Sequence, residues 1–177
     1  AGVPLVRFED GFVRSVGLGS DFLPPASLVL DRRGMYFDPR TPSDLETILR
    51  ETEFGPMLLA RARGLVDQLV QRRVTKYNLG AGARPIEWPP GKRRVLVPGQ
   101  VEDDLSVVLG GGGDIRDNLT LLAAARSAAP DAFIVYKPHP DVLAGHRKGA
   151  VAEADALRFA DRIVTDAATA ALLGEIA

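Results

Sequence analysis

Two apolar runs in the second half of the chain carry the clearest structural signal. Residues 133–136 read Phe, Ile, Val and Tyr, and residues 95–97 read Val, Leu and Val. Neither run alternates with polar positions, which is typical of parallel strands that are buried on both faces. Pro98 and Pro138 follow the runs, and proline cannot continue a sheet ladder. The pattern therefore predicts two short buried strands that stop at these prolines.

Helical patterns connect and follow these two strands. Asp117 can cap a helix over residues 118–129, which lies between the strands in the sequence. The three elements then form one right-handed βαβ unit with parallel strands. Further patterns indicate a helix at residues 150–160, a strand at 162–164 and another helix from Ala167 onward. Together they predict an α/β fold with a Rossmann-like, doubly wound sheet.

The first half of the chain predicts shorter strands. Residues 3–8 indicate a strand that leads into an acidic turn at Gly11, where the absence of a Cβ permits a tight bend. Residues 28–31 and 35–38 flank an Arg-Arg-Gly sequence. This predicts a β-hairpin with Gly34 in the left-handed turn position.

Two helices and a linker follow in the sequence. Ser43, with Glu46 three residues later, forms a capping-box pattern and predicts a helix to about Glu53. Apolar positions at helical spacing predict a second helix over residues 56–73. Glycine, alanine and proline are frequent in residues 80–94, which predicts a linker. We therefore expect one domain portion at residues 1–79 and another at 95–177.

Composition narrows the class of protein. The 177 residues carry a net charge of −1, without the basic excess that a nucleic-acid-binding protein normally shows. No apolar run reaches the roughly 18 residues that a membrane span needs. The chain has no cysteine, so disulfides and thiolate metal sites are excluded. It starts without Met and ends in an apolar helical pattern, from which we expect a fragment of a longer protein.

Polar residues follow the second buried strand directly. Lys137, His139 and Asp141 are interleaved with Pro138 and Pro140, so a cation and an imidazole lie on a stiffened loop at a strand end. In open α/β sheets ligands bind at the carboxyl ends of the strands. This combination suits a phosphate ester, although a solvated loop that merely ends the strand would have the same sequence.

A second polar group lies in the first half of the chain. Glu9 and Asp10 are adjacent carboxylates at a predicted strand end, with Arg14 and Ser15 close behind. Neighbouring strand residues face opposite sides, so only one carboxylate needs to point into a cleft. A solvated acidic turn is the simpler interpretation.

Three kinds of chemistry fit these residues to different degrees. A metal site is disfavoured, because His139 and His146 are seven residues apart and lack helical ligand spacing. A serine hydrolase is disfavoured because no Gly-x-Ser-x-Gly motif is present. The glycine run 110–113 is followed by Asp114 rather than by Lys, so it predicts a mobile turn and not a P-loop. Group transfer from a phosphate-activated donor remains, with a carboxylate acting at the reacting carbon.

Several long motifs resemble one known family. In order along the chain they are EDGFVRSVGLG, PPASLVLDRRGMYFDPRTPSDLETIL, KYNLG, VLVPGQVEDDLSV and YKPHPDVLAGHRKG. They resemble the bacterial capsule polysaccharide biosynthesis/export family, the β-Kdo transferases of Gram-negative bacteria. The resemblance runs from about Val3 to about Asp166. It implies a GT-B glycosyltransferase, which has two Rossmann-like domains and a cleft, with CMP-Kdo as donor and retention of anomeric configuration.

The resemblance also implies roles for individual residues. Asp10 would be the catalytic carboxylate, with its neighbour Glu9 as the alternative. The His139-Pro140 pair would bind the CMP of the donor. From their places at the strand ends we also expect donor contacts from Lys137, Gln100, Glu102, Arg14 and Ser15. Residues 1–79 would end the acceptor-side domain, and 95–177 would be part of the CMP-Kdo domain. No metal and no cofactor other than the donor substrate is expected.

The implied activity is the building of a poly-β-Kdo linker on the lipid anchor of capsular polysaccharide. The expected acceptor is a lyso-phospholipid-linked Kdo. The expected location is the cytoplasm, peripheral at the inner membrane. The expected partners include the capsule export machinery and no nucleic acid. Two alternatives stay open: another CMP-sugar transferase of the sialyltransferase type, and a non-catalytic module of the export machinery. Most of the first domain and a later Ser/Gly-rich motif are missing, so we expect these 177 residues alone to be inactive.

Overall fold

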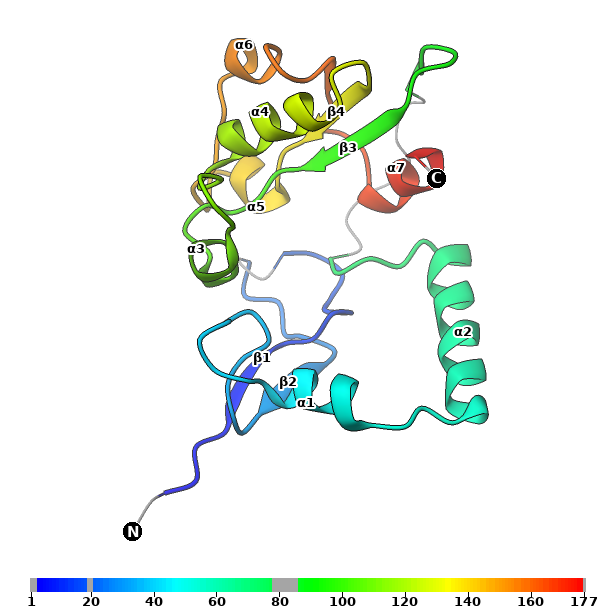
Figure 1. The fold of residues 1–177 in the computed structure, drawn as a ribbon, viewed down its shortest axis with the longest axis vertical. Coiled ribbons are helices and arrows are strands. Elements are labelled where there is room, and N and C mark those ends of the chain that lie inside the picture. The colour runs from blue at the N-terminus through cyan, green and yellow to red at the C-terminus, as the bar shows by residue number, and fades with distance from the viewer. Residues whose placement is uncertain (1–2, 19–20, 78–85, 177) are drawn as a thin grey trace. The chain divides into compact units, whose positions relative to one another are not determined.

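The computed structural model describes residues 3–18, 21–77 and 86–176. The chain divides into two compact units, residues 1–79 and residues 80–177 (Figure 1). Each unit is described by itself below. The assignment of these units to an acceptor side and a donor side stays a prediction.

The second unit is built on a parallel sheet of three strands. They are β3 (Arg94–Pro98), β4 (Phe133–Lys137) and β5 (Arg162–Ile163), in the order β3-β4-β5. Val95 pairs with Ile134, and Tyr136 pairs with Ile163, so β4 is the central strand. The helices are α3 (Leu105–Gly110), α4 (Asn118–Ala128), α5 (Pro140–Leu143), α6 (Glu153–Ala156) and α7 (Thr169–Ile176). The predicted βαβ unit and mixed α/β fold with a parallel sheet are therefore confirmed.

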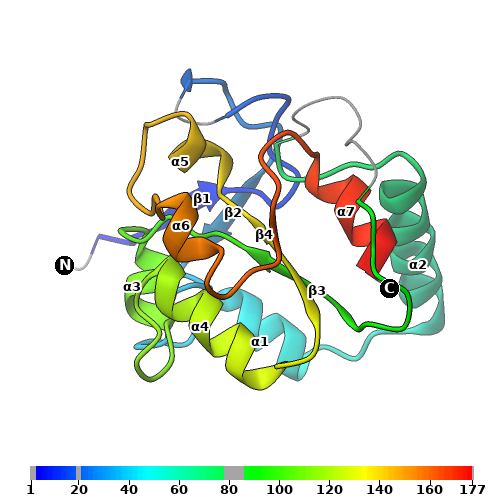
Figure 2. The same cartoon turned by 90° about the horizontal axis from the view of Figure 1, so that it is seen from above.

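Both faces of β4 are covered, which explains its unbroken apolar sequence. Ile134 and Tyr136 pack in one cluster with Leu122 of α4 and Ala156 of α6. Val135 belongs to a second cluster on the other face, which includes residues of α7. Figure 2 shows α4 and α6 on one side of the strands and α7 on the other. Burial of each such large apolar side chain contributes roughly 1.5–3 kcal/mol.

The helix α4 begins where the sequence predicts it. The side chain of Asp117 accepts a hydrogen bond from the backbone N–H of Thr120 (2.7 Å). The Thr120 hydroxyl in turn accepts from the backbone N–H of Asp117 (3.2 Å), which completes a capping box. These contacts satisfy N–H groups that have no partner inside the helix.

The described end of the predicted linker packs onto the second unit. Ile86 is buried in the cluster that contains Val135, and Trp88 packs against it. The indole ring meets Phe133 edge to face at 5.6 Å, and its N–H donates to Glu175 Oε2 (2.6 Å). Residues 80–85 of the linker lie outside the described residues.

The first unit holds a small antiparallel sheet and two helices. Strand β1 (Arg7–Asp10) pairs with β2 (Leu28–Asp31), and α1 (Asp44–Glu51) and α2 (Pro56–Gln71) follow. The capping box at Ser43 is confirmed, and so are both helices to within two residues at their ends. No helix in the described part of the chain is long and apolar enough to cross a bilayer.

The predicted hairpin of residues 28–31 and 35–38 is wrong, because β2 pairs with β1 instead. The buried Asp31 carboxylate accepts backbone N–H bonds from Arg33 and Gly34 through Oδ1 and from Asp44 through Oδ2, each at 2.8 Å. These bonds hold the chain in a loop that leads to α1. Gly34 also lacks the positive φ that the predicted turn requires.

Three further differences from the sequence predictions concern short elements. The first strand lies at Arg7–Asp10 rather than at residues 3–8, and the helix predicted for 150–160 shrinks to α6. The helices α3 and α5 were not predicted. Both are held by a capping side chain at a strand-end loop, Asp104 for α3 and His139 for α5, rather than by a long apolar pattern.

Candidate functional site

The first candidate cluster, which we call the acidic cluster, contains Glu9, Asp10, Arg14 and Ser15 at the end of β1. Gly11 directly follows the last residue of β1 and continues its pairing with the chain before β2. Its N–H donates to the carbonyl of Ser27 (2.8 Å). A Cβ at this position would lie 2.0 Å from Ser27 Oγ, so only glycine fits. The glycine is required by this close approach to Ser27, and the chain bends just after it, at residues 12–13.

Arg14 joins the members of the acidic cluster. Its side chain is almost fully buried, and its Nε donates to Asp10 Oδ2. Nη1 donates to Ser15 Oγ (3.0 Å), and Nη2 donates to the carbonyl of Leu23 (3.1 Å). Burying a guanidinium is costly unless it is paired and hydrogen-bonded, and here both conditions are met. The structure thus brings Asp10, Arg14 and Ser15 together, while their roles stay predictions.

The two adjacent carboxylates have different surroundings. Glu9 Oε1 accepts from the backbone N–H of Asp10 (3.0 Å), so this side chain folds back on its own strand. The Asp10 carboxylate is 29% exposed and is the one that contacts Arg14. Of the two groups, Asp10 combines access with a fixed cationic neighbour.

In the second unit, Lys137 is the last residue of β4, and only 7% of the residue is exposed. Its ammonium makes no hydrogen bond or ion pair with any residue that the structure describes. Burial disfavours the charged form, which lowers the pKa of Lys137. A largely buried cation at the carboxyl edge of a parallel sheet is well placed to receive an anionic group.

His139 is held in a fixed orientation next to Lys137. It caps α5, and its Nδ1 accepts from the backbone N–H of Asp141 (3.2 Å). Asp141 Oδ2 lies 3.8 Å from the same nitrogen. Pro140 is the first residue of α5, a position where its fixed φ suits a helix. Since Nδ1 accepts a hydrogen bond, we infer that the neutral ring carries its proton on Nε2.

The loop after β3 lies against the loop after β4, as the sequence predicts. The N–H of Gly99 donates to the carbonyl of Lys137 (2.7 Å). A Cβ on Gly99 would lie 3.0 Å from the backbone nitrogen of His139, which leaves little room for any residue other than glycine. Gln100 and Glu102 follow on the same loop. The structure therefore gathers the predicted donor-binding residues of this unit at one sheet edge.

Asn118, which sequence reasoning missed, fixes that loop. Its side-chain Oδ1 accepts from the N–H of Gln100 (2.7 Å), and its Nδ2 donates to the carbonyls of Gln100 and Gly149 (2.8 Å each). Its backbone N–H donates to Glu102 Oε1 (2.9 Å). Asn118 is 1% exposed. The only sequence signal was a polar residue at the first position of a helix, where such a residue is usually solvated.

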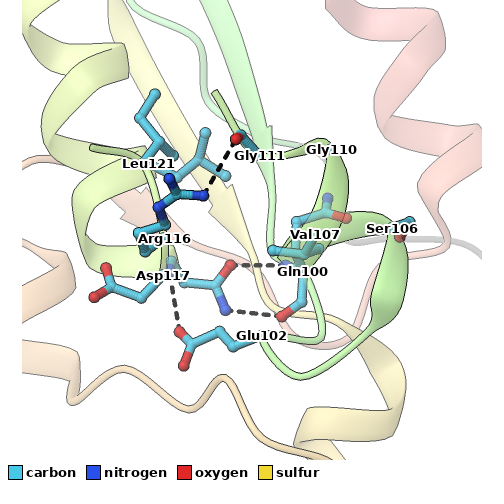
Figure 3. A pocket seen from close by; sticks show the side chains of 11 residues that line it. Gln100, Glu102, Ser106, Val107, Gly110, Gly111, Arg116, Asp117 and Leu121 are labelled. Carbon is cyan, nitrogen blue, oxygen red and sulfur yellow. Dashed lines mark hydrogen bonds between the residues drawn. The ribbon is translucent and has the colours of Figure 1, made fainter. Parts of the chain in front are cut away.

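A cavity of about 210 Å³ lies beside this loop (Figure 3). Its walls come from the loop after β3, from α3, from the glycine run and from the start of α4. The lining residues are Gln100, Glu102, Ser106, Val107, Gly110, Gly111, Ile115, Arg116, Asp117, Asn118 and Leu121. Arg116 donates to the carbonyl of Gly111 (3.3 Å), which ties the glycine run to α4. Of the predicted site residues, Gln100 and Glu102 line this cavity.

Tyr136 is a second residue that the sequence did not single out. Its hydroxyl is buried and has no hydrogen-bond partner among the described residues. Burial, with the nearby Glu102 charge, raises the pKa of Tyr136 to about 12. Among the described residues no group of three or more His, Asp or Glu side chains is arranged to hold a metal ion.

Comparison with known proteins identifies the family. The family described as capsule polysaccharide biosynthesis protein matches residues 1–63 and 56–176. The chain belongs to this family, which confirms the resemblance seen in its motifs.

Two relatives show how much of a longer protein the chain resembles. The capsule polysaccharide modification protein LipA of Neisseria meningitidis serogroup B is 45% identical over 165 residues. These cover 93% of this chain and 23% of LipA. The lipopolysaccharide-processing protein LpsZ of Rhizobium meliloti is 45% identical over 150 residues, 82% of this chain and 34% of LpsZ. The chain thus spans about a quarter to a third of the length of these relatives.

Two solved structures of Thermosulfurimonas dismutans KpsC are similar to the chain. The β-Kdo 2,7 transferase is 35% identical with a TM-score of 0.71, over 93% of this chain and 46% of that structure. The β-Kdo 2,4 transferase is 32% identical with a TM-score of 0.74, over 98% and 59%. The similar structures are therefore Kdo glycosyltransferases, and the chain corresponds to about half of each.

Proposed function

We propose that the protein containing this chain is a glycosyltransferase that moves Kdo from CMP-Kdo to a glycolipid acceptor. The product would be the poly-β-Kdo linker on the lipid anchor of capsular polysaccharide, made beside the inner membrane and the export machinery. The observation that carries this proposal is the similarity of 93–98% of the chain to two β-Kdo transferases. The presence of Asp10, Lys137 and His139 together in the chain supports a catalytic module over a non-catalytic one.

The proposed chemistry uses two inversions. The Asp10 carboxylate attacks the anomeric carbon of Kdo, and the bond to the phosphate oxygen breaks as CMP departs with the electron pair. An acceptor hydroxyl then attacks the same carbon and gives its proton to water, while the ester bond to Asp10 breaks and its electron pair returns to the carboxylate. Two inversions give retention of configuration. The exposed fraction of the Asp10 side chain, 29%, supports its access to the sugar, and Glu9 is bonded to its own backbone instead.

The donor nucleotide would bind at the carboxyl edge of the second unit's sheet. Lys137 and His139 would contact the phosphate, and Pro140 would keep the loop rigid. Lys137 is 7% exposed and its ammonium has no protein partner in the described part of the chain, which supports this role. Gln100 and Glu102 lie on the adjoining loop and would contact other parts of the donor.

A covalent adduct tests the chemistry directly. Full-length protein is incubated with CMP-Kdo in the absence of acceptor, and peptides are fragmented by mass spectrometry. We expect the mass of one Kdo on Asp10, and its loss in Asp10→Ala, which should still bind CMP. Asp67→Asn, an exposed carboxylate change on α2, is the matched control. An adduct on Glu9 or elsewhere, or near-normal turnover by Asp10→Ala, would overturn the assignment.

Nucleotide binding is tested separately by calorimetry. Each hydrogen bond to a charged phosphate contributes roughly 1.5–3 kcal/mol, so His139→Ala should weaken CMP binding by about tenfold or more. An unchanged affinity would remove His139 from the site. Offering CMP-Kdo and CMP-sialic acid to the same enzyme separates a Kdo transferase from a sialyltransferase-like enzyme, since only the true donor yields product.

A further inference from the structure

The position of Arg14 is fixed by the backbone on both sides. Its N–H donates to the carbonyl of Lys76 (3.1 Å), and its carbonyl accepts from the N–H of Ala26 (2.6 Å). The N–H of Ser15 donates to the same Lys76 carbonyl (3.2 Å). The residue is 6% exposed. The guanidinium therefore emerges from a defined backbone position and has little contact with solvent.

All three guanidinium nitrogens of Arg14 donate to groups of the same unit. Nε contacts Asp10 Oδ2, Nη1 contacts Ser15 Oγ, and Nη2 contacts the carbonyl of Leu23. The Ser15 hydroxyl donates onward to the carbonyl of Gly17 (2.7 Å), so a lone pair of its oxygen faces Arg14. Little of the guanidinium is left to approach a bound sugar, although the sequence makes Arg14 and Ser15 candidates for donor binding.

The contact with Asp10 involves a single carboxylate oxygen. An arginine and a carboxylate often pair through two parallel bonds, and that fork would engage both oxygens. Here Nη2, the nitrogen that lies beside Nε, donates to the carbonyl of Leu23 instead, so the described contacts leave Asp10 Oδ1 unengaged. The Asp10 side chain is partly exposed, while that of Arg14 is not. The geometry fixes the carboxylate through one oxygen and leaves the other available.

We infer that Arg14 is a positioning residue that acts through Asp10 and does not bind the donor. It holds Oδ2 of Asp10 so that Oδ1 faces the reacting carbon, and the carbonyl of Leu23 keeps the guanidinium from closing the two-bond fork. This inference rests on the proposed function for the reacting role of Asp10. The orientation of the carboxylate rests on the contacts alone.

The test separates orientation from donor binding in the full-length protein. Arg14→Met keeps an unbranched apolar stem and removes the charge and every N–H donor of the guanidinium. Displacing a reacting group by about 1 Å costs on the order of 100-fold in rate. We therefore expect adduct formation at saturating CMP-Kdo, followed by rapid-quench mass spectrometry, to slow about 100-fold. Arg14→Lys, which keeps the charge, should recover part of that rate.

Donor affinity is measured where no reaction occurs. In an Asp10→Asn background, Arg14→Met should change the Kd for CMP-Kdo by less than about twofold. The reason is that Arg14 does not contact the donor, so its removal costs no donor-binding energy. A weakening of about tenfold or more, the value of one charge-assisted bond, would make Arg14 a donor ligand and overturn the inference. Arg50→Met, at an exposed ion pair on α1, is the matched control for both measurements.

A readout that needs no donor distinguishes this inference from the proposed function. Carbodiimide labelling of Asp10, mapped by mass spectrometry with Asp67 as internal reference, should accelerate severalfold in Arg14→Met, since Oδ2 becomes accessible. Unchanged labelling would sink the positioning role even if the enzyme works as proposed. Wild-type protein that forms no adduct at Asp10 would sink the proposed chemistry, while accelerated labelling would still support the orientation. If Arg14→Met does not fold, Arg14→Lys is judged by the same three measurements.

Discussion

The loop that carries Gln100 and Glu102 should depend on the Asn118 amide. Asn118→Leu keeps similar volume but leaves the N–H and carbonyl of Gln100 and the carbonyl of Gly149 without their partner. The Gly149 carbonyl bond is buried, and an orphaned buried group costs roughly 1–3 kcal/mol. The two Gln100 bonds are only partly buried and lose roughly 0.5–1.5 kcal/mol each, because water can replace part of them. We expect a loss of about 3 kcal/mol in the free energy of unfolding.

Trp88 offers an assay that follows the second unit alone. It is the only tryptophan of the chain, it packs on Phe133, and its N–H contacts Glu175. Its fluorescence should therefore report the unfolding of residues 80–177 in urea. With a slope of about 1–3 kcal/mol per molar urea, a loss of about 3 kcal/mol lowers the midpoint by roughly 1–3 M.

The control lies on the same helix. Ser127 is exposed on α4, and Ser127→Ala should change the free energy of unfolding by less than about 0.5 kcal/mol. If Asn118→Leu also stayed within about 1 kcal/mol of the wild type, the three bonds would not hold the loop. The reasoning from buried polar groups would then be refuted.

Three further predictions concern other residues. Tyr136→Phe removes a buried hydroxyl that has no partner in the described part of the chain. The free energy of unfolding, followed by Trp88 fluorescence, should therefore equal that of the wild type or exceed it by up to about 1–3 kcal/mol. A clear loss of stability would contradict this. Gly11→Ala forces a Cβ against Ser27 and should lower hydrogen-exchange protection of β1 by about 1–3 kcal/mol, whereas unchanged protection would show that the turn relaxes freely. Burial of Asp31 opposes ionisation, but its three backbone hydrogen bonds and the Arg7 charge lower its pKa. The stabilisation by the Asp31 carboxylate is therefore complete above the unfolded pKa of about 3.9 and is lost as pH falls through the folded pKa. The difference in the free energy of unfolding between wild type and Asp31→Asn should accordingly disappear in acid. A difference that stays constant with pH would refute this.

The sequence predicted the elements whose signals are local. Asp117 and Ser43 each cap a helix with a partner three residues away, so the capping pattern lies in one short stretch. Strand β4 was predicted because its apolar run has no polar alternation and ends at proline. The proximity of the loops after β3 and β4 followed from their being parallel neighbours.

The predictions that failed depended on distant partners. Residues 28–31 have hairpin character, but β1 offers a better partner, and Asp31 takes three backbone donors that redirect the chain. Asn118 had no periodic signal, because its function is to bridge Gln100 and Gly149, which are far apart in the sequence. In the acidic cluster, the sequence placed Arg14 near Asp10 but could not show that its other nitrogens are already engaged.

The central position of β4 has a consequence for the protein as it leaves the ribosome. The face with Ile134 and Tyr136 can pack at once on α4, which has already been made. The opposite face, with Val135, can meet Ile86 of its cluster at once but is completed only when Val164 and Leu172 have been made. At roughly 5–20 residues per second, that interval lasts about 2–7 s, and a partly uncovered apolar face during it favours aggregation. The nascent chain therefore has a defined interval in which a chaperone would bind it, at one face of one strand.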